Sequence, residues 1–548
     1  MKNPVKFSLL GGPKSIFNLK ISFSLLSRLA GLVFLTTAIC NPLAALSADS
    51  SFVSIGTRRE LFVDNFLIDK LSGKAELKLH NPEAKNIALV HNEKWEGNTS
   101  GYHSIFLDGN LFRMYYRGSQ ISLSADKNAE LEAHPFYYCY AESNDGINWR
   151  KPNIGLFNFE GSKNNNIVLA SGEIGGLQLN MGDNATMFKD ENPDAAPDAR
   201  YKAVVCADGG ISGKPRGLFA FKSSDAIHWL PMSKEPVITQ GAFDSQNVAF
   251  WDNNNGVYRA YWRYFDRGTS TNPYVGVRSI RTATSKDFIN WSQITDVIYA
   301  DNLSIELYTN QIKNYYRAPH LLIGIPTRYI ERGWSPSMQA LPELEHRKLR
   351  SSHNLRYGTA LTDAMLMTSR DGIQFSRWAE SFLPPGIERE GTWNYGQHYL
   401  AWGMVETKSG LKGAANELSF YSTESSWTNN APTSDLRRFT LRLDGFASVK
   451  APMIGGELLT RPLHFEGKKL SLNMATSAAG SLRVEIADEK GNPLPGFTKD
   501  DCYPVFGDTI ERIVIWKNGS DVSSLIGKTV RLRFILEDAD LFSFQFQH

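Results

Sequence analysis

Four acidic residues stand where segments that read as β-strands begin, and each could take part in proton transfer. They are Glu96, Asp244, Glu306 and Asp363. Two carboxylates in one pocket can divide the work, because one holds a proton as general acid while the other acts as base. That division needs burial or a neighbouring charge to raise the pKa of one partner. A turn or strand-capping role is the competing interpretation for all four residues.

Cationic and aromatic side chains accompany these acids as candidates for ligand binding. Arg117, Arg263 and Arg328 lie on or beside expected strands, where an unpaired guanidinium is rarely buried. Each arginine therefore pairs with a carboxylate or faces an anionic ligand. Aromatic rings and imidazoles could contact a ligand, and packing within the scaffold is the alternative for them: Trp95, His103, Tyr308 and Trp393.

A short phrase, Ser-x-Asp-x-Ile-x-aromatic, recurs four times and marks the elements that must position these side chains. Each copy follows an apolar or aromatic run, which is typical of a strand that ends in a tight turn. Repetition of such a unit favours one sheet per repeat, arranged radially. One active site needs a few distinct groups, whereas every repeat needs its turn. The turn acids are therefore predicted to be structural: Asp145, Asp225, Asp287 and Asp371.

The repeats predict an all-β fold. A fifth unit without the full phrase is expected over 399–427, which gives a five-bladed β-propeller. The segment 60–69 alternates enough to be a strand that completes the last blade and closes the ring. Beyond the propeller, predicted over 49–432, short strands and turns predict a β-sandwich over 433–548.

The N-terminus reads as an export signal. Five basic residues precede or flank an apolar run over 29–39, and small residues follow around 44–48. The run is shorter than the roughly 20 residues of a membrane span. A signal peptide over 1–48 is therefore expected, with no membrane span in the mature chain and a secreted or periplasmic location.

Composition narrows the classes of function. A net charge of +2 and no Lys/Arg-rich run give no reason to expect nucleic acid as a partner. Cys139 and Cys206 lie in apolar strand-like runs, which favours buried free thiols. No Cys/His cluster has the spacing of a zinc site and no loop has that of a calcium site, so no metal and no cofactor are predicted. The oligomeric state stays open.

The turn phrase at 142–149, with Lys151-Pro152 just after it, resembles the blade turns of five-bladed propeller glycoside hydrolases. That superfamily covers glycoside hydrolase families 32, 43 and 68 and relatives that include mannoside phosphorylases. The stretch 95–101, Trp-Glu-Gly-Asn-Thr-Ser-Gly, also resembles the entry segment of family 32. The resemblance covers roughly residues 50–430. It implies a carbohydrate substrate and acidic side chains that project from the first strands of successive blades into a central funnel.

The resemblance also implies roles for single residues. Asp244 lies in a segment similar to the one that carries the superfamily's third acid, which positions the general acid or stabilises the charge on the sugar. Glu306 lies in a segment similar to the one that carries the general acid. The nucleophile position of family 32 falls on Asn98, a candidate for substrate binding whose amide cannot act as that nucleophile. Inversion is therefore slightly favoured, with carboxyl groups roughly 6.5–9.5 Å apart. Glu96 and Asp363 are the supporting acids.

The expected function is thus that of a secreted glycoside hydrolase acting on a plant or algal oligo- or polysaccharide. Two alternatives stay open. A non-catalytic carbohydrate-binding propeller would lack converging carboxylates, and a glycoside phosphorylase would need a basic phosphate pocket beside a single acid. If several of the arginines face the funnel, a sulfated or uronic sugar becomes the favoured ligand.

Overall fold

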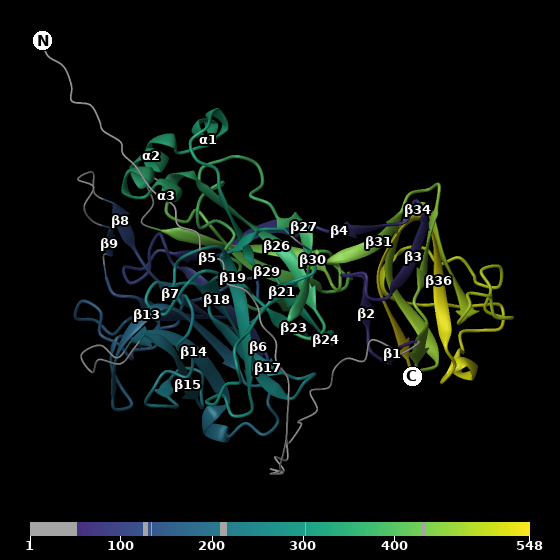
Figure 1. Ribbon diagram of the computed structural model, residues 1–548, viewed down its shortest axis with the longest axis horizontal. Coiled ribbons are helices and arrows are strands. Elements are labelled where there is room, and N and C mark those ends of the chain that lie inside the picture. The colour runs from purple at the N-terminus through teal and green to yellow at the C-terminus, as the bar shows by residue number, and fades with distance from the viewer. Residues whose placement is uncertain (1–51, 124–129, 133, 209–215, 302, 429–432) are drawn as a thin grey trace, which may run out of the picture. The chain divides into compact units, whose positions relative to one another are not determined.

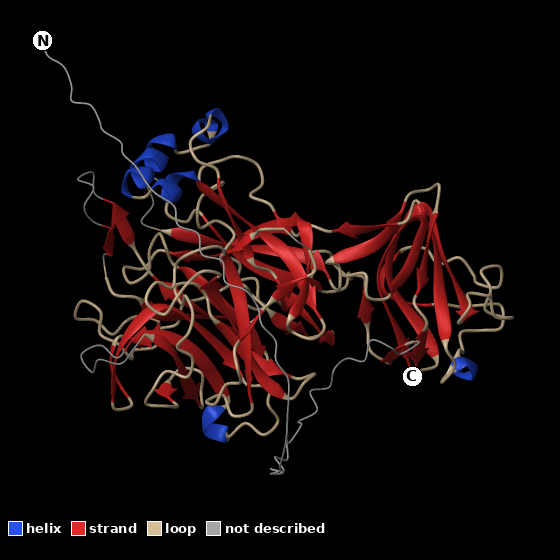
Figure 2. Ribbon diagram, in the orientation of Figure 1, coloured by secondary structure: helices blue, strands red, loops and turns tan. Residues whose placement is uncertain are grey.

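The computed structural model describes residues 52–548, except 124–129, 133, 209–215, 302 and 429–432. The predicted signal peptide, 1–48, lies outside the described residues. Strands make up most of the described chain, and helices are few and short (Figures 1 and 2). The all-β class predicted from the sequence is therefore confirmed.

Each of the four turn phrases closes a strand, as the sequence predicts. The strands that end at the serine of a phrase are β10 (Tyr137–Ser143), β15 (Gly217–Ser223), β19 (Arg278–Ser285) and β26 (Ala360–Ser369). In the first copy, the Gly146 N–H donates to the Ser143 hydroxyl (2.9 Å) and the Ile147 N–H donates to Asp145 Oδ1 (2.7 Å). The side chains thereby satisfy backbone donors that have no partner in the strand ladder.

Five sheets follow one another to form the propeller (Figure 1), and four of them are simple blades of four or five strands. The first blade holds β6 (Gly101–Asp108), β7 (Leu111–Gly118), β10 and β11 (Ile167–Ala170). The second holds β12 (Gly172–Ile174), β13 (Leu177–Lys189), β14 (Tyr201–Asp208), β15 and β16 (Leu230–Pro231). The third holds β17 (Val248–Asp252), β18 (Val257–Phe265), β19 and β20 (Thr295–Asp296). The last holds β5 (Glu83–His91), β28 (Val405–Thr407), β29 (Glu417–Glu424) and β30 (Ser434–Arg442).

The sheet between the third and last blades is larger and has seven strands. These are β21 (Ile298–Tyr299), β22 (Glu306–Leu307), β23 (Lys313–Tyr315), β24 (Ala318–Gly324), β25 (Thr327–Glu331), β26 and β27 (Gln374–Leu383). Three short helices are inserted between β25 and β26: α1 (Pro336–Ala340), α2 (Leu344–His353) and α3 (Leu355–Thr359). α2 contacts β8 (Ile121–Leu123), which pairs with β9 (Glu130–Glu132). The propeller class is confirmed, but one of the predicted equivalent blades carries this insertion.

Hydrogen bonds join the innermost segments of all five sheets around the axis. The Gln246 amide donates to the carbonyl of His103 (3.0 Å) and to Thr186 Oγ1 (3.3 Å). The Gln311 amide donates to Gln246 Oε1 (2.7 Å) and to the carbonyl of Leu400 (2.5 Å). Polar groups that converge where the blades meet are thus paired with one another instead of being buried without partners.

The strand that closes the propeller is not the predicted one. β5 pairs antiparallel with β30, with Leu89 opposite Leu436. The segment 60–69 instead contributes to β2 (Glu60–Leu61) and β3 (Ile68–Gly73), which pair with strands of another sheet. The error has a physical cause: alternation shows that a segment is a strand with one buried face, but it does not specify the pairing partner.

The other large sheet has ten strands and draws them from both ends of the described chain. Its N-terminal members are β1 (Val53–Gly56), β2, β3 and β4 (Glu76–Leu79). Its C-terminal members are β31 (Ala447–Ala451), β32 (Gly456–Thr460), β33 (Leu463–Phe465), β34 (Lys469–Asp488), β35 (Asp508–Ile513) and β36 (Val530–Gln547). The chain changes sheet between β30 and β31, so the boundary differs from the predicted division at 432/433.

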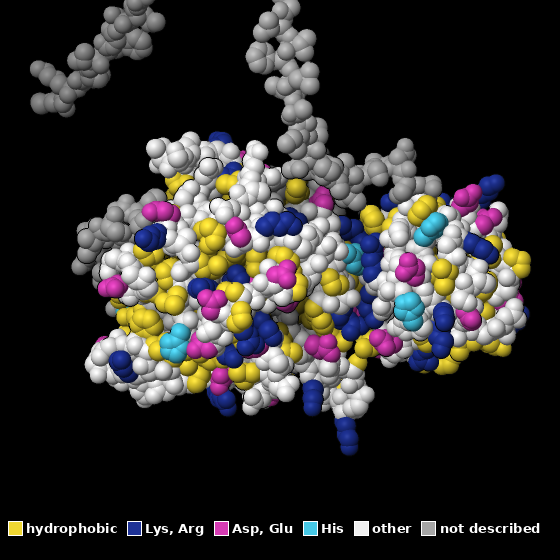
Figure 3. Space-filling model, turned by 90° about the horizontal axis from the view of Figure 1, so that it is seen from below, with side chains coloured by type: hydrophobic (Ala, Val, Ile, Leu, Met, Phe, Trp, Pro, Cys, Tyr) yellow, Lys and Arg dark blue, Asp and Glu magenta, His cyan; other side chains and the backbone are white. Residues whose placement is uncertain are grey.

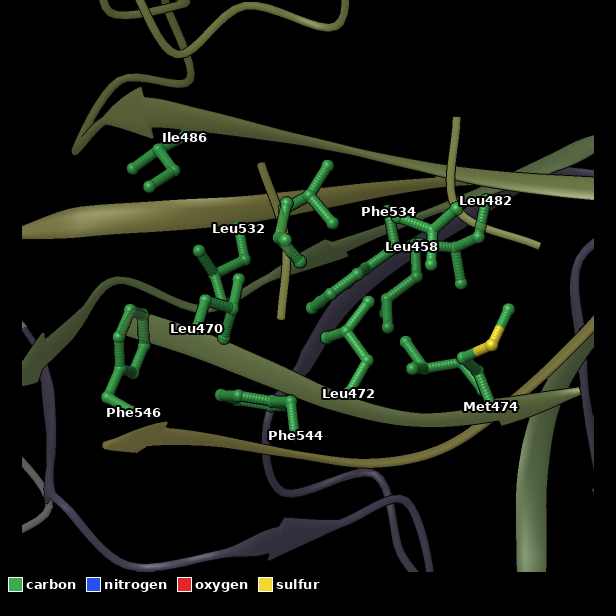
Figure 4. Packing of buried hydrophobic residues seen from close by; sticks show 14 of the residues in the cluster. Leu458, Leu470, Leu472, Met474, Leu482, Ile486, Leu532, Phe534, Phe544 and Phe546 are labelled. Carbon is green, nitrogen blue, oxygen red and sulfur yellow. The ribbon is translucent and has the colours of Figure 1, made fainter. Parts of the chain in front are cut away.

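A continuous apolar core fills this ten-stranded sheet region (Figure 4). Along β36, Leu532, Phe534 and Leu536 are buried while the residues between them are partly exposed. This period of two is that of a strand with one buried face. Leu470 and Leu472 of β34 are also buried, as is Ser471 between them, and Figure 4 shows such apolar side chains gathered between strands. Each fully buried Leu or Phe contributes roughly 1.5–3 kcal/mol.

Neither the surface nor the cysteines mark a functional site. Basic, acidic and hydrophobic side chains are interspersed on the face shown in Figure 3. In the part of the chain that the structure describes, no helix is both long and apolar enough to cross a membrane. Cys139, Cys206 and Cys502 are buried and free, which confirms the prediction of buried thiols.

Candidate functional site at the mouth of the propeller

Two carboxylate–arginine pairs lie at the entry to the inner segments of adjacent sheets. Asp244, just before β17, contacts Arg263 of β18, and Glu306 of β22 contacts Arg278, the first residue of β19. The Arg263 and Arg278 side chains are 2% and 10% exposed, whereas those of Asp244 and Glu306 are 33% and 30% exposed. The acids are therefore accessible to solvent, and the cations lie beneath them.

One tyrosine links the two pairs. The guanidinium carbons of Arg263 and Arg278 lie 4.6 and 5.6 Å from the centroid of the Tyr308 ring. The same two carbons lie 5.4 and 5.1 Å from the Phe265 ring. These distances are those of cation–π contacts. The fold thus brings together the two acids and two of the binding residues, Arg263 and Tyr308, that the sequence predicts.

Tyr308 belongs to a group of five buried phenols, here called the tyrosine cluster: Tyr102, Tyr308, Tyr329, Tyr395 and Tyr399. The hydroxyl of Tyr395 donates to that of Tyr308 (2.9 Å), and the rings of Tyr308 and Tyr399 stack at 5.0 Å. Burial, with neighbouring phenols adding to it, raises the pKa of Tyr102, Tyr395 and Tyr399 well above the ordinary value. Their hydroxyls therefore stay protonated at neutral pH, and that of Tyr395 is already used as the donor to Tyr308.

Two further arginines border the tyrosine cluster. The Arg117 guanidinium, from β7, lies 4.8 Å from the Tyr102 ring and donates to the carbonyl of Thr99 (3.1 Å). The Arg356 guanidinium, from α3, lies 5.7 Å from the Tyr395 ring. The inserted helices therefore supply a charged side chain to the mouth, which a plain propeller blade would lack.

A cavity of about 640 Å³ adjoins the cluster, and its lining includes Glu306, Arg328, Tyr329, Asp363 and Trp393. Arg328 donates to both oxygens of Asp363, from Nε at 2.9 Å and from Nη2 at 2.6 Å. In the ladder, Glu306 lies opposite Tyr329 and Arg328 lies opposite Asp363. Because side chains alternate along a strand, Glu306 and Asp363 leave opposite faces of the sheet. Asp363 is held by Arg328 and does not pair with Glu306.

The electrostatic surroundings keep Asp244 ionised. Burial acts to raise the pKa of this carboxyl, but the Arg263 guanidinium outweighs burial and holds the pKa below its ordinary value. An ionised carboxylate can accept a proton and cannot donate one. Asp244 therefore suits the role of a base or of an electrostatic partner, and not that of a general acid.

Glu96 and Trp95 are not brought to the mouth, contrary to their prediction as catalytic and binding residues. The Glu96 carboxylate is buried and accepts from the hydroxyl of Tyr116 and from Lys151 Nζ (2.6 Å). The Trp95 indole N–H donates to Asn166 Oδ1 (2.6 Å). These internal partners occupy the polar groups of both side chains within the first blade.

Asn98 and His103, also predicted to bind substrate, serve the scaffold instead. The Asn98 amide donates to the carbonyl of Ile121 (2.9 Å) and accepts from its N–H (3.0 Å), which fixes the start of β8. His103 is fully buried, with Nε2 2.9 Å from Nε2 of His91. Burial lowers the pKa of both imidazoles, to about 3 for His91, so both rings are neutral.

The four turn aspartates have the structural role predicted for them. Each accepts two backbone N–H bonds from its own turn: Asp145, Asp225, Asp287 and Asp371. Burial opposes ionisation, but these bonds together with side-chain hydrogen bonds outweigh it and lower the pKa of Asp145 and of Asp287 to about 2. The lowered values reflect local turn geometry and carry no catalytic meaning.

Several residues at the mouth were missed by sequence reasoning: Tyr102, Arg278, Tyr329, Arg356 and Tyr399. One signal was available for Tyr102 and Tyr399. Both stand at the entry to an inner segment of a sheet, as the predicted Tyr308 does. Arg278 and Arg356 have no such signal. Arg278 is one of many arginines on strands, and Arg356 comes from the insertion.

The arrangement offers two accessible carboxylates, guanidinium donors and phenolic donors beside an open cavity. Such groups can bind a ligand rich in hydroxyl or anionic oxygens and can exchange protons with it. In the described part of the chain, no three His, Cys, Asp or Glu side chains are grouped so as to hold a metal ion. Another cavity, of about 540 Å³ beside Trp262 and Trp291, is lined by none of the candidate acids.

No family model matches the chain, and no curated protein matches it. Similar solved structures include an N-acetylgalactosamine deacetylase from F. plautii in complex with blood group B trisaccharide, at 12% identity and TM-score 0.39, over 67% of this chain and 96% of that one. They also include a family 43 arabinoxylan arabinofuranohydrolase from Bacillus subtilis in complex with cellotetraose, at 12% identity and TM-score 0.38, over 85% and 99%. An endo-arabinase from Bacteroides thetaiotaomicron gives 10% identity and TM-score 0.36, over 65% and 98%. At these scores the function has to be argued from this chain's own residues.

Proposed function

We propose that the protein is a glycoside hydrolase whose reaction takes place at the mouth of the propeller, between Asp244 and Glu306. One observation carries the proposal. These two carboxylates, from adjacent sheets, flank the same tyrosine through their arginine partners and are each about one-third exposed. Hydrolysis of a glycosidic bond needs two carboxyl groups on opposite sides of the bond.

The surroundings of the two acids suggest how the roles divide. Asp244, held ionised beside Arg263, is assigned as the base that activates water. Glu306 lines the cavity and is assigned as the acid that protonates the leaving oxygen. This role requires bound substrate to replace the contact between Glu306 and Arg278, because that contact occupies the carboxyl group that must face the leaving oxygen. A water-activating base implies inversion.

The test is release of reducing sugar from a panel of plant and algal polysaccharides, with Glu306→Gln and Asp244→Asn as active-site variants. Each change is expected to lower kcat at least about 100-fold, the usual contribution of a positioned acid or base. Glu489→Gln, an exposed residue in a turn after β34, is the matched control and should keep full activity. Unchanged turnover in both active-site variants would sink the proposal.

A non-catalytic carbohydrate-binding protein is the second candidate, and a specific observation favours it. Both acids at the mouth are already engaged by arginines, and the pKa of Asp244 is lowered and not raised. A wild-type protein that binds a polysaccharide tightly but releases no reducing end from it would select this alternative.

We also propose that the mature protein is exported. The basic, apolar and small segments in order over 1–48 support this. Expression of the full-length chain in a bacterial host, followed by fractionation and N-terminal sequencing, tests it. Export predicts a shortened chain outside the cytoplasm, whereas an intact N-terminus in the cytoplasmic fraction would contradict it.

A further inference from the structure

Three arginines at the tyrosine cluster have donor groups that the described chain does not fully use. Nε and Nη1 of Arg263 and Nε of Arg278 are buried, and no described residue accepts a hydrogen bond from them. Buried N–H groups without an acceptor are uncommon because they have lost their hydration without replacement. The third arginine, Arg356, forms no salt bridge with any described carboxylate. Its guanidinium bonds to the Tyr357 side chain and lies over the rings of Tyr357 and Tyr395.

Among the described residues, the mouth holds one cation that no carboxylate neutralises. Arg263 and Arg278 each have a carboxylate partner, whereas Arg356 forms no salt bridge. Glu331, a further acid of the cavity lining, accepts from the Tyr329 hydroxyl (2.7 Å). The Arg356 guanidinium lies 5.1 and 5.7 Å from the ring centroids of Tyr357 and Tyr395. Protonated phenols can donate hydrogen bonds but cannot balance this charge. An anion that enters the mouth would find the unneutralised charge of Arg356 and the unused donors of Arg263 and Arg278.

We infer that this site recognises an anionic sugar, whose acidic oxygens are bound by Arg356 together with the unused donors of Arg278 and Arg263. The inference rests on the proposed function, because it names the substrate class for the same site. A guanidinium presents its N–H groups in a planar fork that matches two oxygens of one anionic group. The shared chemistry is therefore a sugar with a carboxylate or a sulfate ester.

Matched polysaccharides separate these two sources of anionic oxygen. The wild-type full chain is tested for binding, by affinity electrophoresis, and for release of reducing sugar. The probes are polygalacturonate and its carboxyl-reduced form, κ-carrageenan and its desulfated form, and neutral arabinan. The expected result is that wild type binds one anionic polymer at least about tenfold more tightly than the neutral form made from it, as the loss of a charge-assisted contact predicts. Equal binding of each matched pair would overturn the inference.

Variants then assign the effect to Arg356. Arg356→Gln should lose the preference for the anionic polymer, and Arg356→Lys should keep part of it because the charge remains. Arg512→Gln, which removes the same charge from an exposed position on β35, is the control and should bind as wild type does. Thermal melting of each variant checks the fold. If Arg356→Gln keeps the wild-type preference while folded, the inference is wrong.

The outcomes separate this inference from the proposed hydrolase. Turnover of a neutralised polymer at the same rate as its anionic parent, or turnover of arabinan at the rate of the anionic polymers, would keep the hydrolase and overturn the anionic ligand. Binding of an anionic polymer that depends on Arg356, without release of reducing ends, would support the anionic ligand and overturn the hydrolase. Absence of both binding and turnover on the whole panel would count against both.

Discussion

Charged side chains are fully paired at the junction of the last blade with the ten-stranded sheet and only partly paired at the mouth of the propeller. At the junction, Asp444 is fully buried and accepts from the hydroxyls of Tyr315 (2.7 Å) and Ser543 (3.1 Å) and from Arg317 Nε (2.8 Å). Arg59 adds a further contact at 3.3 Å. Asp444 follows the last blade, Tyr315 belongs to β23 of the seven-stranded sheet and Ser543 to β36 of the ten-stranded sheet, so three sheets meet at one carboxylate whose oxygens are fully used.

At the mouth, the hydrogen bonding of the same residue types is incomplete. Asp244 forms a salt bridge with Arg263 and has one-third of its side chain exposed, while Arg263 keeps two buried nitrogens from which no described residue accepts a hydrogen bond. The difference teaches which charges hold the fold and which are available to a ligand. A network of buried charges that is fully paired stabilises one arrangement, because removing any member leaves the others unpaired. Charges with unused donors can gain partners from outside.

The largest effect on stability is expected at the junction. Asp444→Ala leaves Arg59 and Arg317 buried without their common anion, so the free energy of unfolding should fall by about 3–5 kcal/mol. Urea denaturation followed by tryptophan fluorescence measures this. The control is Asp500→Ala at an exposed turn, which should change stability by less than about 0.5 kcal/mol. Equal effects of the two changes would remove the distinction between the regions.

Acid should weaken the junction through Glu60. Burial acts to raise the pKa of this carboxyl, but His320, Arg370 and Arg58 hold it at about 2, against an ordinary value of 4.5. Its contribution to stability, roughly 3 kcal/mol, is therefore complete above pH 4.5 and is lost as the pH falls toward 2. The difference in unfolding free energy between wild type and Glu60→Gln should shrink over that window. A difference that stays constant from pH 7 to pH 3 would contradict the assignment.

A smaller loss of stability is expected when the mouth is changed in the same way. Asp244→Asn should cost about 1–2 kcal/mol, because the carboxylate is partly exposed and the amide oxygen can still accept from Arg263. The same variant should lose most of its activity, which makes it the opposite of Asp444→Ala. The two properties are measured on one preparation by urea denaturation and by the reducing-sugar assay. A loss of unfolding free energy above about 3 kcal/mol would show that the Asp244–Arg263 pair holds the fold instead of serving a ligand.

The smallest effect is expected at the blade turns. Asp145→Ala removes the acceptor for two exposed backbone donors and should cost about 1 kcal/mol, as the loss of a helix cap does. Asp145→Ala and Asp287→Ala lie in different blades, so their costs should add in the double variant. Thermal and urea unfolding check both statements. Marked non-additivity would show that the turns are coupled and not independent.

Much of the propeller follows from local chemistry that a sequence displays directly. The turn phrase places the ends of four strands correctly because its serine and aspartate bond to groups within a few residues of themselves. Strand partners are harder to predict, because they depend on contacts between distant residues. The predicted closure by 60–69 failed for this reason, and β5 took its place.

The candidate site divides in the same way. Asp244 and Glu306 stand out because they occur once, at the entry to an inner strand, and the fold does bring them to one tyrosine. Glu96 has the same local appearance, but Lys151 lies 55 residues away in sequence and its contact cannot be foreseen. Arg356 was missed because its place depends on how an insertion folds back over the mouth.

The pairing of β5 with β30 has a consequence for how the protein is made. Glu83–His91 leaves the ribosome early, yet it must wait for Ser434–Arg442 before its sheet is complete. The ten-stranded sheet has the same property, because β2 pairs with β36. Contacts this distant in sequence slow folding and leave strand edges exposed during synthesis. A cut between β30 and β31 would therefore leave the last blade whole but divide the ten-stranded sheet. The C-terminal fragment would lack β1 to β4, and it should not be soluble when expressed alone.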